Sequence, residues 1–125
     1  MGIYVHVPFC RSKCFYCGFY SVASLTLKEA YLEAVEREIV LRRGYLPRQE
    51  MKTLYFGGGT PSYLEHGDLE RIIRKLEENY LFATGMERTI ELNPEDLVPG
   101  KLQGIKDLGF NRLSIGVQSF SDEQL

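Results

Sequence analysis

Three cysteines stand close together near the start of the chain, at Cys10, Cys14 and Cys17, and the sequence contains no other cysteine. A disulfide framework uses an even number of cysteines and an oxidising compartment, so this C-x3-C-x2-C spacing does not suit one. Three thiolates held this close together would repel one another unless a cation neutralised them. The spacing therefore predicts a metal site.

The kind of metal depends on the number of ligands. Structural zinc is held by four cysteines or histidines, and iron–sulfur clusters are usually held by four thiolates. Here His6 is the only nearby candidate for a fourth ligand, and no second C-x2-C or H-x3-H pair follows. Two interpretations stay open on the residues alone. One is a zinc site, and the other is a four-iron cluster that keeps one iron open for a substrate or cofactor.

The elements that must position this loop alternate along the chain. Residues 3–6, 52–56, 89–92 and 112–116 are predicted to form strands. A capping box at residues 26–29 predicts a helix that ends at Gly44, with one face formed by Tyr31, Ala34, Val35 and Ile39. Apolar residues at helical spacing predict a second helix over 69–80, and a third is expected over 100–108. This alternation favours an α/β fold with a parallel sheet.

The other candidate site residues lie at or just past the predicted strand ends, where parallel sheets bind their ligands. Three glycines at positions 57–59 would let backbone amides approach a ligand, although such a run can also be a simple tight turn. Glu91 could bind a ribose hydroxyl or could be a solvated strand residue. Gln118 follows the last predicted strand. One ligand could contact all of these positions.

Taken with their neighbours, these residues resemble the radical S-adenosylmethionine (SAM) superfamily. The cysteine motif, with Tyr16 before its third cysteine, resembles the superfamily signature. Residues 3–10, 55–62, 91–95 and 112–120 are similar to one branch, which contains the oxygen-independent coproporphyrinogen III oxidases and the radical SAM heme chaperones. The resemblance runs in order from Tyr4 to Phe120, which is nearly the whole chain.

The resemblance implies a fold and a set of site residues. The chain would be the front part, about four βα units, of a partial (β/α)6 barrel. Residues 1–125 would be the N-terminal part of the radical SAM core domain and a fragment of a longer chain. The three cysteines would hold a [4Fe-4S] cluster whose open iron binds SAM. The remaining implied contacts to SAM or the cluster are Tyr4, Tyr16, Gly58, Gly59, Thr60, Glu91 and Gln118.

The implied chemistry is one-electron cleavage of SAM to methionine and a 5′-deoxyadenosyl radical that abstracts hydrogen. Because the cofactors carry this chemistry, no side chain need act as a general acid or base, and we assign no catalytic residue. Within the branch, the oxidase has a further cysteine two residues beyond the third cluster ligand, where this chain has Phe19. This difference favours a heme chaperone over an oxidase that decarboxylates coproporphyrinogen in porphyrin biosynthesis. The implied partners are SAM, heme or porphyrin, an electron donor and heme-accepting respiratory proteins, with peripheral membrane association of the full-length protein.

Composition limits the other possibilities. The formal net charge of −2 and the isoelectric point near 5.7 give no electrostatic footprint for nucleic acid. No signal peptide and no apolar run long enough to cross a bilayer are apparent, and reduced cysteines point to the cytoplasm. A capping box at residues 121–124 predicts that a further helix begins where the chain stops, which suggests a piece of a longer protein. Two other classes stay open: a structural zinc module, and a nucleotide-binding protein with a redox-sensing cysteine loop.

Overall fold

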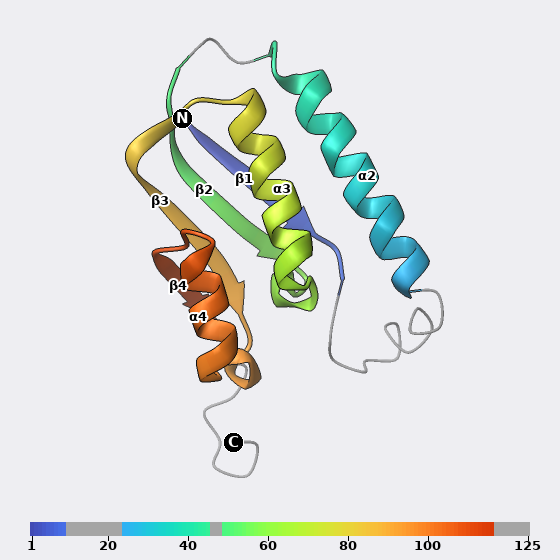
Figure 1. Cartoon of the computed structure of the whole chain (residues 1–125), viewed down its shortest axis with the longest axis vertical. Helices are drawn as coiled ribbons and strands as arrows, with labels where there is room; N and C mark the ends of the chain where they lie inside the picture. The colour runs from blue at the N-terminus through green and yellow to red at the C-terminus, as the bar shows by residue number, and fades with distance from the viewer. Residues whose placement is uncertain (10–23, 46–48, 117–125) are drawn as a thin grey trace.

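The computed structural model describes residues 1–9, 24–45 and 49–116 (Figure 1). In this part of the chain, four parallel strands form one sheet in the order β1-β2-β3-β4. The predicted α/β class with a parallel sheet is therefore confirmed. The strands are β1 (Gly2–Val7), β2 (Met51–Gly58), β3 (Phe82–Leu92) and β4 (Arg112–Ile115). The α-helices are α2 (Ser24–Arg42), α3 (His66–Asn79) and α4 (Pro99–Asp107). Two short 3-10 helices are η1 (Pro61–Tyr63) and η2 (Pro94–Asp96).

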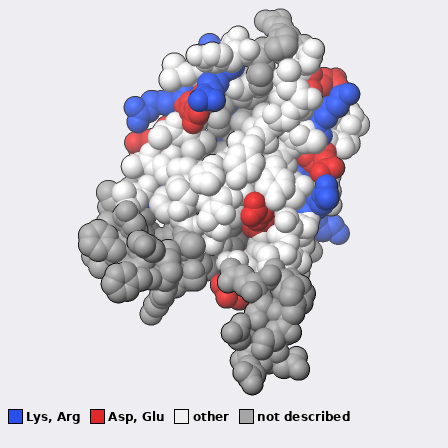
Figure 2. Space-filling view, turned by 180° about the vertical axis from the view of Figure 1, so that it is seen from behind, with Lys and Arg blue, Asp and Glu red and all other residues white. Residues whose placement is uncertain are grey.

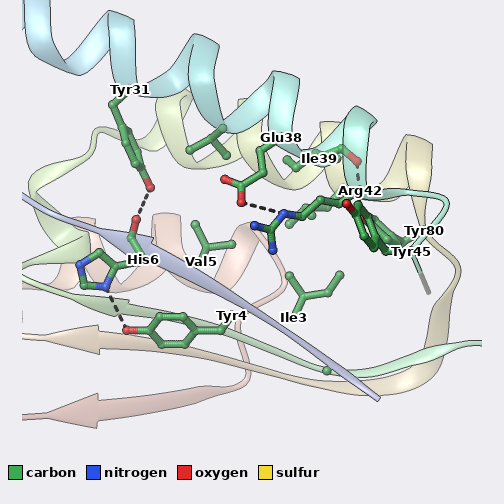
Figure 3. Close-up of a pocket in the computed structure, with 13 residues that line it drawn as sticks. Ile3, Tyr4, Val5, His6, Tyr31, Glu38, Ile39, Arg42, Tyr45 and Tyr80 are labelled. Carbon is green, nitrogen blue, oxygen red and sulfur yellow. Dashed lines mark hydrogen bonds and ion pairs between the residues drawn. The ribbon is translucent and has the colours of Figure 1, made fainter.

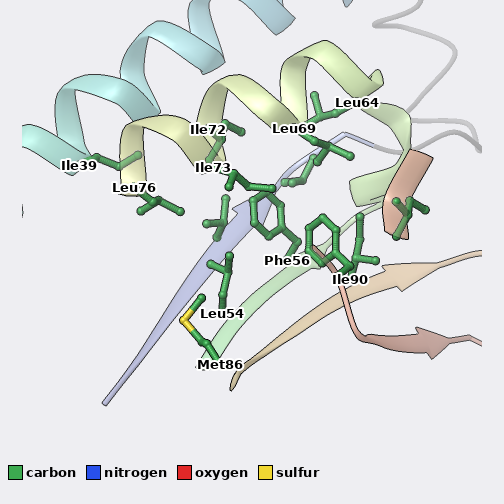
Figure 4. Close-up of a cluster of buried hydrophobic side chains, with 14 of the residues drawn as sticks. Ile39, Leu54, Phe56, Leu64, Leu69, Ile72, Ile73, Leu76, Met86 and Ile90 are labelled. Carbon is green, nitrogen blue, oxygen red and sulfur yellow. The ribbon is translucent and has the colours of Figure 1, made fainter. Parts of the chain in front are cut away.

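The described helices all lie on one side of the sheet (Figure 1). Alternate residues of β1 and of the carboxyl-terminal halves of β2 and β3 point toward them and are apolar, so the core lies between the sheet and α3 (Figure 4). The strands contribute Val5, Val7, Leu54, Phe56, Ile90 and Leu92, all of them buried. Phe56 has no exposed surface, and its ring meets that of Phe110 edge to face with 5.4 Å between centroids.

The helix α3 confirms the strongest helical pattern in the sequence. Its buried residues are Leu69, Ile72, Ile73 and Leu76, which repeat at the spacing of one helical face. Each of these side chains contributes about 1.5–3 kcal/mol by leaving water. This stripe holds the helix on the sheet and leaves the strand ends free for other contacts.

Two predicted boundaries were wrong. The third strand begins at Phe82, seven residues before the predicted start, because its first half is stabilised by contacts from distant parts of the chain. The guanidinium of Arg88 lies 5.1 Å from the centre of the Phe82 ring, and Asn111 accepts a hydrogen bond from the Arg88 amide at 2.9 Å. The helix α2 begins at Ser24, so the predicted capping box at residues 26–29 lies inside it.

The predicted inner face of α2 was also partly wrong. Ala34 is exposed, whereas Leu32, which the pattern did not include, is buried. The helix packs against α3, and its buried face runs through Leu32 and Ile39 rather than through Ala34. The predicted helix at residues 121–124 lies outside the described residues.

The opposite face of the sheet carries no helix among the described residues (Figure 1). Most of the charged side chains visible from that side lie near its margins (Figure 2). In the part of the chain that the structure describes, no helix has the length and apolar character needed to span a membrane.

Candidate functional site

Half of the predicted site residues lie within the described part of the chain. They are Tyr4, Gly58, Gly59, Thr60 and Glu91, and they come together on the helix-free face and at the carboxyl edge of the sheet. The other predicted residues, Cys10, Cys14, Tyr16, Cys17 and Gln118, lie outside the described residues, as does Phe19.

Strand register explains why these side chains meet. Tyr4 pairs with Tyr55, and His6 pairs with Gly57, so these positions of β1 and β2 face the same side. On the next strands Thr89 pairs with both Tyr55 and Arg112, and Glu91 pairs with Ser114. The helix-free face is therefore polar and aromatic, and these residues form two rows across it.

Gly57 is the point where three of these side chains converge. A Cβ atom at this position would lie 2.9 Å from the Tyr4 hydroxyl oxygen and 2.8 Å from Cε1 of Tyr55, and it would clash with Oε1 of Glu91. The rings of Tyr4 and Tyr55 are stacked, with 5.7 Å between centroids. The missing side chain at Gly57 therefore gives the Glu91 carboxylate and the Tyr4 phenol room to approach each other.

Gly57 and Tyr55 belong to this candidate site but were not predicted from the sequence. The glycine run was interpreted as a whole, and its functional positions were assigned to Gly58, Gly59 and Thr60. The strand period was the available signal, because Tyr55 and Gly57 lie two residues apart on one strand and therefore share a face.

His6 is the second polar side chain at the end of β1. Its Nδ1 atom lies 3.4 Å from the Tyr4 hydroxyl, and its ring packs on Gly58, where a Cβ would lie 2.8 Å from Nδ1. Gly58 has a φ of +114°, a conformation that favours glycine. No group of three or more histidine, cysteine, aspartate or glutamate side chains that could hold a metal occurs within the described residues.

The backbone of His6 is fixed by a helix residue. Tyr31 of α2 donates a hydrogen bond from its hydroxyl to the His6 carbonyl at 2.6 Å (Figure 3). Burial raises the pKa of the Tyr31 phenol to about 12, so the donor stays protonated at neutral pH. This bond ties α2 to the end of β1.

The glycine run is bonded to the start of the cysteine loop. The Gly59 amide donates to the Val7 carbonyl at 2.8 Å, and the Thr60 amide donates to the Phe9 carbonyl at 2.6 Å. A Cβ at Gly59 would lie only 2.5 Å from the Phe9 oxygen, so the close approach requires glycine. Phe9 directly precedes Cys10 in the sequence. The loop therefore leaves β1 from a fixed point beside Gly59.

The turn after Glu91 is also fixed by a buried carboxylate. Asp96 is fully buried, and its Oδ2 accepts a hydrogen bond from the Asn93 amide at 3.0 Å. Its other oxygen lies 3.1 Å from Nζ of Lys101. A buried carboxylate needs such partners, and here they hold the turn that follows β3.

The sequence matches the radical SAM superfamily over residues 4–125. It is 38% identical over 125 residues to the oxygen-independent coproporphyrinogen III oxidase of Escherichia coli (strain K12), covering 98% of this chain and 27% of that protein. It is 43% identical over 129 residues to the heme chaperone HemW of Synechocystis sp. (strain ATCC 27184 / PCC 6803 / Kazusa), covering 98% of this chain and 31% of that protein.

A solved structure gives the same result. The fold is similar to that of the coproporphyrinogen III oxidase HemN from Escherichia coli, described as a radical SAM enzyme, with a TM-score of 0.81 and 35% sequence identity. The similarity covers 98% of this chain and 29% of the other chain. The chain thus spans about a third or less of the length of the relatives that it matches.

Proposed function

Because the chain belongs to the radical SAM superfamily, in the group of oxygen-independent coproporphyrinogen III oxidases and HemW heme chaperones, we propose that it is the cofactor-binding part of a longer heme chaperone. The observation that carries the proposal is the bond between the Thr60 amide and the Phe9 carbonyl. It anchors the start of the cysteine loop at the sheet edge where Tyr4, His6 and Glu91 meet. A metal centre on that loop would lie next to these polar groups.

The proposed cofactors are a [4Fe-4S] cluster on Cys10, Cys14 and Cys17, and SAM. When bound, the cluster supplies the electron that cleaves SAM. The described residues fit SAM in their chemistry, because a carboxylate, a phenol and an imidazole gather over glycines whose missing side chains admit these groups. We assign the contacts to Tyr4, Gly58, Gly59, Thr60 and Glu91, together with Tyr16 and Gln118 outside the described residues.

These residues have separate tasks in the proposal. The Glu91 carboxylate accepts hydrogen bonds from the amino or hydroxyl groups of SAM. The Tyr4 ring, which is stacked on Tyr55, provides SAM with an apolar surface, and the Tyr4 hydroxyl provides a polar group at its end. The Gly59 amide is bonded to Val7 at the end of β1 and the Thr60 amide to Phe9 just past it, so they position the start of the cysteine loop, and their contribution to SAM binding comes from close backbone approach. No side chain of the chain transfers a proton.

The choice of heme chaperone depends on Phe19. Both kinds of protein are named among the relatives, at similar identity. The position two residues after Cys17 holds phenylalanine here, where the oxidase pattern has a further cysteine. We therefore propose heme as the bound molecule and heme-accepting respiratory proteins as partners, with an electron donor for the cluster, in the cytoplasm or at the membrane surface. The second candidate is the oxidase, which acts on coproporphyrinogen.

The test begins with anaerobic reconstitution of the natural protein with iron and sulfide, followed by EPR of the reduced protein with and without SAM. We expect a four-iron signal that changes when SAM is added. Cys14→Ala should abolish the signal, and the matched control Ser12→Ala, in the same loop, should retain it. Zinc in place of iron would contradict the proposal, and so would a cluster whose EPR signal does not change when SAM is added.

The two functions are then separated by incubating the cluster-loaded protein with heme or with coproporphyrinogen. A heme chaperone binds heme and passes it to an acceptor, whereas the oxidase releases carbon dioxide from coproporphyrinogen in a SAM-dependent reaction. Turnover of coproporphyrinogen would establish the second candidate.

A further inference from the structure

A cavity of about 600 Å³ lies between α2 and the open edge of β1 (Figure 3). In the described sheet, β1 pairs with β2 on one side and has no neighbouring strand on the other. The helix α2 lies beyond this open edge and packs against α3. The residues Leu76 and Tyr80 of α3 line the cavity together with residues of β1 and α2. Its volume lies in the usual range for small-molecule sites, which is about 300–1,000 Å³.

Apolar and aromatic side chains form much of the wall of this cavity, beside the charged Glu38 and Arg42. Ile3 and Val5 of β1 face Val35 and Ile39 of α2 across it. Four of the eight tyrosines of the chain also line it, namely Tyr4, Tyr31, Tyr45 and Tyr80. Flat aromatic ligands stack well on such rings.

Two of the four tyrosines are held in place and remain uncharged at neutral pH. The Tyr31 hydroxyl donates to the His6 carbonyl at 2.6 Å, and the Tyr80 hydroxyl donates to the Ile39 carbonyl at 3.4 Å. Burial raises the pKa of both phenols. Their rings therefore form fixed, neutral walls, while Tyr45, which is 80% exposed, lies at the mouth of the cavity.

Arg42 supplies the only guanidinium among the described lining residues. Figure 3 shows its head group extending from α2 into the space above β1. Its Nε atom lies 3.0 Å from a carboxylate oxygen of Glu38, one helical turn earlier. Recognition of a carboxylate by arginine commonly uses a pair of parallel N–H groups, which the two terminal nitrogens can supply.

The cavity also reaches the candidate site. Its lining includes Ile3 and Val5 from the helix-covered face of β1, and Tyr4 and His6 from the polar face. It therefore passes around the edge of the strand. Imidazole and phenol groups are among the side chains that hold haem iron in proteins, and both occur at this end.

We infer that this cavity is the heme-binding site of the protein, with Arg42 bound to a propionate and the macrocycle lying against the tyrosines. The inference rests on the proposed function and adds the location of its ligand. A planar conjugated ring suits these aromatic walls, whereas coproporphyrinogen is not conjugated across its macrocycle and carries four carboxylates for a single guanidinium. The cavity is open to solvent at Tyr45, as release of heme to an acceptor requires.

The inference is tested by titrating hemin into the cluster-loaded natural protein and following Soret absorbance. Arg42→Gln should raise the dissociation constant about fivefold to twentyfold, because a charge-assisted pair is lost at a partly exposed position. Tyr45→Ala should raise it about threefold to tenfold. The matched control is Arg43→Gln, which changes a neighbouring arginine outside the cavity and should leave hemin binding unchanged.

Both test positions are exposed, so circular dichroism and the EPR signal of the cluster should be the same in all variants. Hemin bound to vacant cysteines is recognised from the EPR signal of the cluster, which is recorded with each titration, since hemin that binds only to protein without that signal belongs to the thiolates and contradicts the inference. If hemin binds equally to all variants, heme lies elsewhere and the inference fails, while the chaperone proposal stands. If neither the wild type nor any variant binds hemin, both the inference and the chaperone proposal fail.

Discussion

Replacing Gly59 by alanine tests whether the glycine run positions the cysteine loop. A Cβ at this residue would lie 2.5 Å from the oxygen and 3.0 Å from the carbonyl carbon of Phe9, and 3.3 Å from the Val7 oxygen. All three atoms belong to the backbone, so no side-chain rotation can relieve the contact. The end of β1 must move away from the end of β2, and Phe9, which directly precedes the cysteine loop in the sequence, moves with it.

The expected loss of stability follows from the same contacts. The amides of Gly59 and Thr60 bond to Val7 and Phe9 at 2.8 and 2.6 Å. Each backbone hydrogen bond contributes a net of about 0.5–1.5 kcal/mol, and overpacking costs about 1–3 kcal/mol. Movement of β1 away from Gly59 relieves the overpacking but weakens the two hydrogen bonds, so the two costs do not add in full. We expect the free energy of unfolding to fall by about 2–4 kcal/mol.

The matched control is Gly67→Ala in the first turn of α3, where nothing lies within 4 Å of the added atom. Alanine in place of glycine in a helix usually stabilises by about 0.5–1 kcal/mol, so the two variants should change stability in opposite directions. Urea unfolding measures the stability, and iron bound per chain is measured after anaerobic reconstitution of the folded protein. Equal iron content and equal stability in the two variants would refute the reasoning.

Glu91→Gln is expected to weaken SAM binding to the cluster-loaded protein about tenfold, because a charge-assisted hydrogen bond becomes a neutral one. Glu87→Gln, on the same strand and face, should bind SAM as the wild type does in calorimetry. Phe56→Ala should lower the free energy of unfolding in urea by about 3–5 kcal/mol, because a fully buried ring is removed. Tyr31→Phe should lose about 1 kcal/mol of stability below pH 10. Since burial raises the pKa of Tyr31 from 10.0 to about 12, stability of the wild type that is present below pH 10 is lost as the pH rises toward 12. The phenylalanine variant should show a smaller decline, because it keeps Tyr80, whose pKa burial also raises.

Each of these predictions has a result that contradicts it. Equal weakening by Glu91→Gln and Glu87→Gln would show a general effect of charge rather than a contact with SAM. A loss below about 1 kcal/mol for Phe56→Ala would mean that the core closes around the missing ring. Parallel alkaline profiles for the wild type and Tyr31→Phe would show that another group titrates.

The parts of the fold that the sequence predicted well are those set by local pattern. The helix α3 was predicted because its apolar residues lie on one face and that face is the one in the core. Half of β3 was missed because residues 82–88 contain Gly85 and two charged residues, and such a composition does not resemble a strand. What makes it a strand is contact with Asn111, which donates to the Met86 carbonyl at 2.9 Å from a distant part of the chain.

The same distinction applies to the site. Glu91 and the glycine run were found because they sit at strand ends, which the sequence can indicate. The register between β1 and β2 determines which residues meet across them. It places Gly59 against Phe9, and it lets Gly57 accommodate the Tyr4 hydroxyl. Register is a property of paired strands, so no pattern within either strand could give it. The cavity beside β1 likewise depends on where α2 packs.

The two faces of the sheet have separate roles, one in the core and one in the candidate site. Parallel sheets usually have both faces covered by helices, and their strands are then apolar throughout. Here β1 and β2 alternate, with Val5 and Phe56 toward the helices and Tyr4 and Gly57 away from them. The apolar face therefore carries the core, and the polar face carries the described candidate site residues. Because β1 borders both the helix-free face and the cavity under α2, a ligand in the cavity would contact the strand that begins the cysteine loop. Heme binding and the cluster site would then be coupled through the position of a single strand.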